Sequence, residues 1–469
     1  MEKEKNIKKK FTMPHTFAII FAIIIIATIL TWIIPGGSYV RYVNKQGIKV
    51  IDPSKFEYIK NTPVNPLKIP IYIVNGFCKN IELMLVILFS GGAFHMITKS
   101  GALHTVIAKL AKKFSNHIEI FIPLLTLVFG LICTTQGVNT FIAFAPVMVM
   151  MSLALELDSI CGAAIILLGG AIGFATGTLN VNTTILSQKI ADLPLYSGIG
   201  YRAVCFIVYF IFTNIYLINY AKKIKQNPKL SSMYDLDMKN EIKETTNLEE
   251  FGEMNIRKWA VIICLLAALT AIVYGCIALE WDLKEQASVF LTLGITVGVI
   301  SGFKINTICK EFLNGCKLML GAAFIIGLAR SIGSIMSDGD IIDTIVHSLA
   351  GILSYIPFHL QGTGMLIVNT IINVFITSGS GQASVVMPIM IPLADLIGIT
   401  RQTTILAFNF GDGFCNFILP TSTALMGIIS AVNIPYDRWM KFMWKCFLMW
   451  LAIGAVLLFI AQIIKLGPM

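Results

Sequence analysis

Two stretches of this chain, one in each half, carry the same landmarks in the same order. Each begins with an Asn-Gly pair, continues into a similar eight-residue run, and then reaches a proline and a Gly-Phe pair. The matched positions are Asn75-Gly76 with Asn314-Gly315, 104–111 with 343–350, Pro146 with Pro388, and Gly173-Phe174 with Gly413-Phe414. Each copy also places a small polar cluster inside apolar sequence. The pattern predicts an internally duplicated transporter whose binding site lies between the two halves.

The composition places the chain in a lipid bilayer. Of its 469 residues, 56% are hydrophobic and 13% are charged, about half the charged share of an ordinary soluble domain. The first apolar run follows a basic segment and leads through Pro35 into a polar loop without a small-residue cleavage site, so we expect an uncleaved first span. Apolar runs near the length of a membrane span occur at 16–34, 83–98, 159–179, 201–220, 258–277, 288–302, 318–336 and 442–464.

Several classes of function find little support in the sequence. The net charge of +10 comes from lysines at span ends, which are orientation signals, and no basic stripe with interleaved aromatic residues predicts a nucleic-acid partner. The ten cysteines lie mostly in apolar runs and form no CxxC pair, as expected of small buried side chains. No HExxH, nucleophile elbow or GxxxxGK[ST] motif indicates a membrane enzyme or an ATP-driven pump. A passive channel, the remaining alternative, would need a continuous polar stripe, whereas the polar clusters lie at two midpoints.

Charge patterning predicts a multi-pass protein of the cytoplasmic membrane with its amino terminus inside. The acidic stretch after Lys229 is expected to be a solvated connector, with a regulatory segment as the alternative. Two extra spans between the copies give the repeats inverted topology. The predicted units are a basic segment and first span at 1–34, an external loop at 35–74, a first repeat at 75–220, a cytoplasmic linker at 221–257, two connecting spans at 258–313 and a second repeat at 314–469.

Each repeat contains an apolar stretch that is split near its middle. Residues 361–394 carry no charge, yet a Ser/Gly-rich run at 377–382 divides them into two arms. Arms of about 16 residues are too short to cross a 30 Å hydrocarbon core twice, and unpaired backbone at that depth must line a protein cavity or water. We therefore expect re-entrant hairpins at 118–155 and 361–397, with short amphipathic arms before them at 102–114 and 340–356.

The hairpin tips are the candidate binding elements. Glycine lets backbone amides approach a ligand, and a helix that starts at the tip presents its positive end, which suits a carboxylate. Hydroxyls and carbonyls also suit sodium, and the structural alternative is small-residue helix packing. The candidate substrate-binding residues are Thr135, Gln136, Gly137, Asn139, Ser378, Gly379, Ser380, Gly381, Gln382, Asn416 and Thr421.

A span that is itself interrupted follows each hairpin, at 173–184 and at 411–423. Asp412 is the only carboxylate in these segments, where we expect unwound backbone. An ionisable group at membrane depth indicates function, so Asp412 is predicted to be a proton or sodium site or the partner of a substrate ammonium, with a water-exposed carboxylate at the external mouth as the alternative. Arg330 and Arg401 are interpreted as interface anchors, with substrate-carboxylate pairing as the alternative. The candidate coupling set is Asp412, Asn180, Asn182, Thr183 and Ser422, with sodium near both tips or a proton as coupling ion and no other cofactor.

Three runs carry a family resemblance. MPHTFAIIFAIIIIATILTWIIPGGSY, GFATGTLNVNTTILSQKIADLPLYSGIGYR and SGSGQASVVMPIMIPLADLIGITRQTTILAFNFGDGFCNFILPTST resemble the YfcC-type branch of the C4-dicarboxylate anaerobic carrier family. The resemblance implies an all-α polytopic membrane protein of the ion-transporter superfamily, with two inverted repeats that each carry a re-entrant helical hairpin and an unwound transmembrane helix. It also implies an elevator-like motion and a homodimer. The first tip, CTTQGVNT, lacks the acidic residues expected there, which leaves the coupling ions open.

The substrate has two interpretations within this resemblance. One is a dicarboxylate such as succinate, and the other is an amino acid, including exchange of arginine for ornithine. A fixed carboxylate at Asp412 would repel a dianion and favour an ammonium group, although bound sodium would reverse that argument. The sequence thus favours an amino acid or related small molecule, with an ion-coupled C4-dicarboxylate carrier as the alternative.

Overall fold

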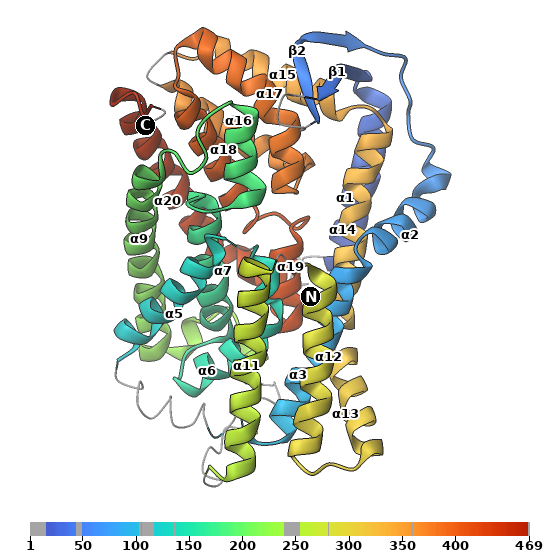
Figure 1. Ribbon diagram of the computed structural model, residues 1–469, viewed down its shortest axis with the longest axis vertical. Helices are drawn as coiled ribbons and strands as arrows, with labels where there is room; N and C mark the ends of the chain where they lie inside the picture. Colours follow the sequence, from blue (N-terminus) through green and yellow to red (C-terminus); the bar gives the residue numbers. More distant parts are fainter. Residues whose placement is uncertain are drawn as a thin grey trace, which may run out of the picture.

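The computed structural model describes residues 16–43, 49–102, 105, 117–135, 137–238, 254–279, 281–357 and 360–467. These residues are mostly helical (Figure 1). Six of the described helices are long and apolar enough to span a membrane, and a pair bent by 43° at 305–338 makes a seventh candidate. The expectation of an all-α multi-pass membrane protein is confirmed. The six are α3 (Ile81–Lys99), α7 (Ser159–Thr176), α9 (Ile199–Gln226), α12 (Leu283–Ile300), α17 (Gly379–Ile397) and α20 (Tyr436–Ile463).

Two helices that pack on each other form the centre of the molecule. They are α7 and α18 (Arg401–Cys415), and nearly all of their side chains are buried. An apolar run without a polar face, such as the one that forms α7, is typical of a fully buried helix. A Cβ atom added at Gly413 would collide with Ala175, so glycine allows the two backbones to approach. Asp158 and Thr400 cap the starts of these helices by accepting from Cys161 N and Thr403 N.

Each central helix carries the two arms of one broken hairpin. The arms α5 (Ile118–Cys133) and α6 (Ala145–Ala154) pack on α7, and the arms α16 (Gln361–Phe375) and α17 pack on α18. In Figure 1 the first pair of arms lies in the lower half of the molecule and the second pair in the upper half. Inverted repeats would produce this arrangement, and the inversion itself stays a prediction.

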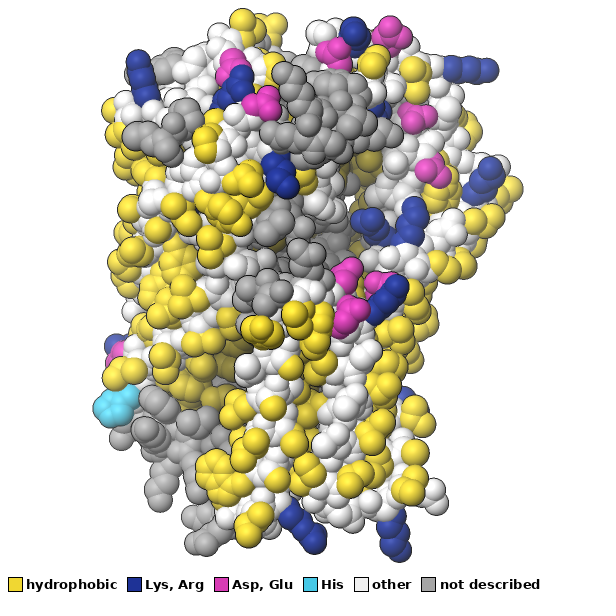
Figure 2. Space-filling model, in the orientation of Figure 1, with side chains coloured by type: hydrophobic (Ala, Val, Ile, Leu, Met, Phe, Trp, Pro, Cys, Tyr) yellow, Lys and Arg dark blue, Asp and Glu magenta, His cyan; other side chains and the backbone are white. Residues whose placement is uncertain are grey.

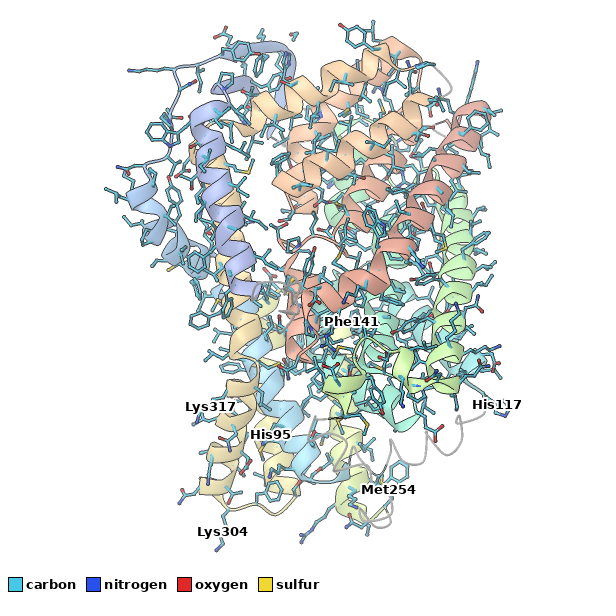
Figure 3. The ribbon with its side chains drawn as sticks, turned by 180° about the vertical axis from the view of Figure 1, so that it is seen from behind. His95, His117, Phe141, Met254, Lys304 and Lys317 are labelled. Atoms are coloured by element: carbon cyan, nitrogen blue, oxygen red, sulfur yellow. The ribbon has the colours of Figure 1, made fainter. Side chains whose placement is uncertain are left out.

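A second group of helices lies beside this central body. Here α3 packs on α12 and α13 (Ile305–Leu318), while α14 (Leu320–Asp338) packs on α1 (Thr16–Ile33) and α2 (Ile69–Lys79). Figure 3 shows His95, Lys304 and Lys317 at the lower end of this group. Hydrophobic side chains cover much of the face in Figure 2, and several Lys and Arg side chains lie at its upper and lower ends, with a further group of charged side chains near mid-height.

The segment expected to be an external loop contains a β-hairpin. Strands β1 (Gly37–Val43) and β2 (Lys49–Tyr58) pair antiparallel, with an irregularity between Tyr39 and Arg41. The hairpin is fastened to α15 (Ile342–Ile352) by an Arg41–Asp343 ion pair of 2.9 Å and by the Tyr39 hydroxyl, 2.7 Å from Nδ1 of His347. The helix α15 falls in the expected arm at 340–356, whereas most of the other arm, at 102–114, lies outside the described residues.

The first part of the expected linker is packed rather than solvated. Asp237 is only 4% exposed and accepts from Ser159 N at 3.0 Å, which satisfies an amide at the start of α7. Asp158 accepts from the Tyr220 hydroxyl and from Ser231 Oγ, each at 2.6 Å. Buried polar contacts of this kind hold residues 231–237 against the protein. The remainder of the acidic stretch, 239–253, lies outside the described residues.

Candidate functional site

The second interrupted span breaks later than the sequence predicted. Helix α18 continues through Asp412 to Cys415, and irregular backbone runs from Asn416 to Ser422 before α19 (Thr423–Ala431) begins. The prediction that Asp412 lies in unwound backbone is therefore wrong. Gly411 and Gly413 serve close packing instead, since a Cβ atom at Gly411 would lie 2.6 Å from Cβ of Asn369.

The first interrupted span breaks at the expected place. Helix α7 ends at Thr176, and Gly177 adopts a left-handed φ of +60°, a conformation that favours glycine. A short π-helix (Val181–Ile185) and α8 (Leu186–Ile190) follow. Asn180 Oδ1 accepts from Thr183 N at 3.1 Å, so this asparagine supports the break itself. The side chain of Asn182 lies outside the described residues.

Both hairpins are broken at their predicted tips. Ser378 caps the start of α17 by accepting from Gly381 N at 3.3 Å. In the first hairpin, Gly137 precedes a 3₁₀ helix, η2 (Val138–Phe144), which leads into α6. Thr135 donates back to Ile132 O, at 3.0 Å, and Gln136 lies outside the described residues.

One cavity of about 410 Å³ collects most of the predicted site residues. Both hairpin tips and the second broken span line it, so the starts of η2, α17 and α19 meet around one space. Side chains from the second helix group, including Asn80 and Arg330, close the cavity from the other side. The predicted residues that line it are Gly137, Asn139, Thr183, Ser378, Gly379, Ser380, Asn416, Thr421 and Ser422.

Asp412 lies directly behind the tip of the second hairpin. Its side chain is fully buried, and Oδ1 accepts from Asn373 Nδ2 at 2.8 Å. The other oxygen, Oδ2, has no hydrogen-bond partner among the described residues. A Cβ atom at Gly379 would lie 3.0 Å from this oxygen and 2.7 Å from Cγ2 of Thr183. The carboxylate is thus buried one layer below the cavity, and in this conformation it does not contact water at an external mouth.

Three of the predicted residues play structural parts in this conformation. Gln382 is buried and donates to Asn369 O at 3.0 Å, which joins the two arms of the hairpin. Asn180 supports the first break, and Thr135 bonds to its own helix. Gly381 lines a neighbouring cavity instead. Arg401 pairs with Asp395 at 2.7 Å, away from the site, in agreement with the interface-anchor interpretation.

Sequence reasoning missed Asn373, and the structure places Arg330 in the cavity wall. Asn373 lies in the middle of an apolar arm, and an amide in that position was an available signal for a partner at depth. The favoured interpretation of Arg330 was an interface anchor, but the arginine lines the cavity between the two tips. Among the described residues, no group of three or more His, Cys, Asp or Glu side chains lies together.

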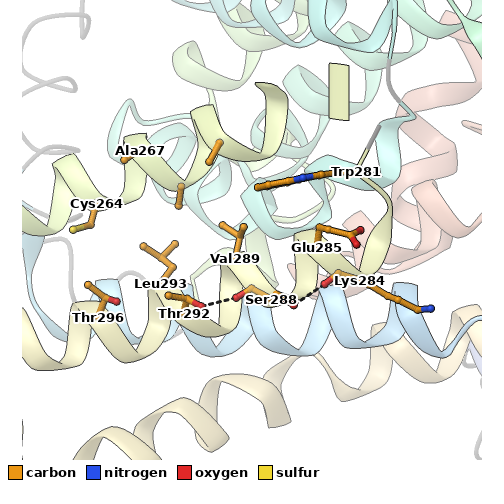
Figure 4. Close-up of a pocket in the computed structure, with 12 residues that line it drawn as sticks. Cys264, Ala267, Trp281, Lys284, Glu285, Ser288, Val289, Thr292, Leu293 and Thr296 are labelled. Atoms are coloured by element: carbon orange, nitrogen blue, oxygen red, sulfur yellow. Dashed lines mark hydrogen bonds between the residues drawn. The ribbon is translucent and has the colours of Figure 1, made fainter. Parts of the chain in front are cut away.

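A larger cavity, of about 580 Å³, lies between α11 (Ile256–Ala278) and α12 (Figure 4). Small and apolar side chains such as Ala267 and Leu293 form much of its wall. Two of its hydroxyls bond to their own helix, with Ser288 Oγ 2.9 Å from Lys284 O and Thr292 Oγ1 2.8 Å from Ser288 O. This cavity does not include either hairpin tip, so it is not the candidate site.

Comparison with known proteins shows to which family this chain belongs. The family model of the C4-dicarboxylate anaerobic carriers, DcuC, matches residues 13–463. The chain belongs to this family. A protein of Escherichia coli K12 named "Putative basic amino acid antiporter YfcC" is 29% identical over 477 residues, which cover 93% of this chain and 94% of that protein. The predicted YfcC-type branch is confirmed. An uncharacterized Haemophilus influenzae protein is also 29% identical, over 96% of this chain and 97% of its own length.

Two solved transporter structures show a weaker likeness. The YdaH transporter of Alcanivorax borkumensis is 14% identical with a TM-score of 0.41, over 96% of this chain and 98% of its own. MtrF of Neisseria gonorrhoeae is 15% identical with a TM-score of 0.44, over 97% and 96%. Similarity at this level carries no argument about the site. Membership of a carrier family, together with the membrane helices, makes this member of the DcuC family a multi-pass membrane transporter of a small molecule, and not an enzyme.

Proposed function

We propose that this carrier is a secondary active transporter of a small carboxylate-bearing metabolite across the cytoplasmic membrane, with its amino terminus inside. The observation that carries the proposal is the meeting of three helix starts around one cavity. The first residues of η2, α17 and α19 all line it. Backbone amides at helix starts carry partial positive charge and bind carboxylates. A carboxylate of the substrate is bound there.

An amino acid is the substrate class that the site favours, with exchange of a basic amino acid such as arginine for ornithine as the leading case. Asp412 adds a negative charge behind Gly379, which favours a substrate that also carries an ammonium group. The name of the Escherichia coli relative, with which the chain shares most of its length, supports the same class.

An ion-coupled C4-dicarboxylate carrier is the second candidate. Arg330 lines the cavity, and no acidic side chain is among the described residues of its wall. The family description names this substrate class. A sodium ion or proton at Asp412 would offset its charge, and Thr183 and Ser422 offer hydroxyls in the cavity wall. In this case Asp412 acts on the coupling ion instead of on an ammonium group.

The transport mechanism we propose is elevator-like alternating access. The cavity lies between two bodies, the central α7/α18 group with its hairpins and the group that contains α3 and α14. Movement of the first body along the second carries a site formed by both tips across the membrane. We further propose that the protein is a homodimer, and that the second body is the part that stays fixed in the membrane while the first body moves.

Uptake into proteoliposomes tests the function. Labelled arginine and labelled succinate are each supplied with and without a sodium gradient, and with and without internal ornithine. Arginine uptake that needs internal ornithine and ignores sodium supports the exchanger, whereas sodium-driven succinate uptake supports the dicarboxylate carrier. Flux of both compounds that needs neither a gradient nor an exchange partner would indicate a channel and contradict the proposal.

A further inference from the structure

The substrate cavity continues into a second cavity, of about 260 Å³, and Arg330 lines both of them. The two cavities also share Ala329, Thr377 and Ser378, so they meet beside the tip of the second hairpin. The second cavity extends along α14 to Asp338, at the end of the molecule that carries the β-hairpin. Arg330 therefore lies where an access path meets the candidate site.

Arg330 is a cation of this path for which the described residues supply no partner. Its side chain is exposed, and it has no hydrogen-bond or ion-pair partner among the described residues. The neighbouring charges are engaged, because Lys79 donates to Ser334 Oγ at 3.2 Å and Asp338 accepts from the Tyr72 hydroxyl at 2.9 Å. An arginine that only anchored a helix at the membrane surface would not need to face a cavity between two hairpin tips.

We infer that Arg330 is a specificity-determining residue that binds the carboxylate of the substrate opposite the helix starts of the hairpin tips. The inference rests on the proposed function and extends it to a residue of the second body. A guanidinium binds a carboxylate through two parallel hydrogen bonds, and the helix starts bind through backbone amides. The second body supplies the guanidinium and the first body supplies the backbone amides. The carboxylate site would therefore be complete only while the tip of the second hairpin lies beside Arg330.

Compounds with and without the carboxylate test this role. In proteoliposomes, external labelled arginine is competed with agmatine, which is arginine without its carboxylate. We expect Arg330→Gln to raise the half-saturation concentration for arginine about 10- to 100-fold, the loss typical of a hydrogen bond between charged groups, while inhibition by agmatine is unchanged. Arg330→Lys restores part of the loss. If succinate is the substrate, succinamide, which has no carboxylate, replaces agmatine in the same comparison.

The outcomes separate this inference from the proposed function. Lys60→Gln, which removes an exposed lysine next to the β-hairpin and outside both cavities, is the matched control and should behave as wild type. Equal weakening of arginine and agmatine by Arg330→Gln, or no change in either, overturns the role of Arg330 while the transport function stands. Failure of the wild-type protein to accumulate either labelled compound overturns the proposed function itself.

Discussion

Asn373 donates a hydrogen bond from Nδ2 to Oδ1 of Asp412 over 2.8 Å, and the other oxygen of that carboxylate faces Gly379. The contact joins the last turn of the first arm of the hairpin, α16, to the end of α18. A buried carboxylate with one free oxygen is unfavourable unless a cation or a proton joins it. This geometry is the reason for proposing Asp412 as the coupling residue or as the partner of a substrate ammonium.

Replacement of this carboxylate by an amide should stop or uncouple transport without unfolding the protein. Asp412→Asn keeps the size of the side chain and its acceptor for Asn373, but it removes the charge. We expect uptake to fall at least 100-fold, or to lose its dependence on the coupling ion. Uptake and size-exclusion profiles are measured beside Asp395→Asn, which removes a half-exposed carboxylate outside the cavity. Wild-type uptake and ion dependence in Asp412→Asn would show that the residue is structural.

A glycine at the second hairpin tip and a glycine outside the site should respond differently to the same small change. Gly379→Ala adds a methyl group 2.7 Å from Thr183 Cγ2 and 3.0 Å from Asp412 Oδ2, so it should push the tip away from the second span and abolish uptake. Gly200→Ala, in α9 and outside the cavity, meets nothing within 4 Å and should keep wild-type uptake. Initial uptake rates, normalised to the amount of folded protein, test the pair. Equal rates for the two variants would contradict close packing of the second tip in the transport cycle.

Cysteines at the two tips should report the inverted arrangement. Gly137→Cys and Gly381→Cys place thiols on hairpins whose arms lie in opposite halves of the molecule. We expect a membrane-impermeant thiol reagent to label them from opposite sides in the two end states. Labelling is compared with the parent protein because its native cysteines, such as the exposed Cys78 and Cys309, also react. Labelling of both positions from one side alone would exclude the inverted hairpins.

The linker segment around Asp235 should be held less tightly to the rest of the protein at acidic pH. The hydrogen bond from Arg438 lowers the pKa of Asp235 to about 2, from an ordinary value of 3.8. Because the folded pKa is the lower one, the pair stabilises the protein fully above about pH 4, and this contribution is lost as the pH falls toward 2. The apparent melting temperature of Asp235→Asn in detergent should lie slightly below wild type at pH 7, since the pair is exposed. A difference that persists unchanged at pH 2 would contradict this role.

Much of the fold was predictable because it depends on local chemistry. The length of each apolar run, and the need to satisfy every backbone amide in lipid, predicted the spans and both broken hairpins. The pairing of β1 with β2 was missed. The strands are close in sequence, but their attachment to Asp343 depends on a contact 302 residues along the chain. The break after α18 lies later than predicted, because Gly411 packs closely against Asn369 inside the helix.

The sequence by itself determined the membrane class, the family, the two hairpin tips and the residues around them, because each is marked by composition or by a continuous motif. Only the tertiary structure decided which of those residues share one cavity. Thr183, Gly379 and Thr421 come together there, whereas Gln382 faces the hairpin arms and Asp412 lies behind the tip. It also brought Arg330 to the cavity from a separate helix group. The direction in which a side chain points depends on how helices distant in sequence pack, and no local pattern contains that information.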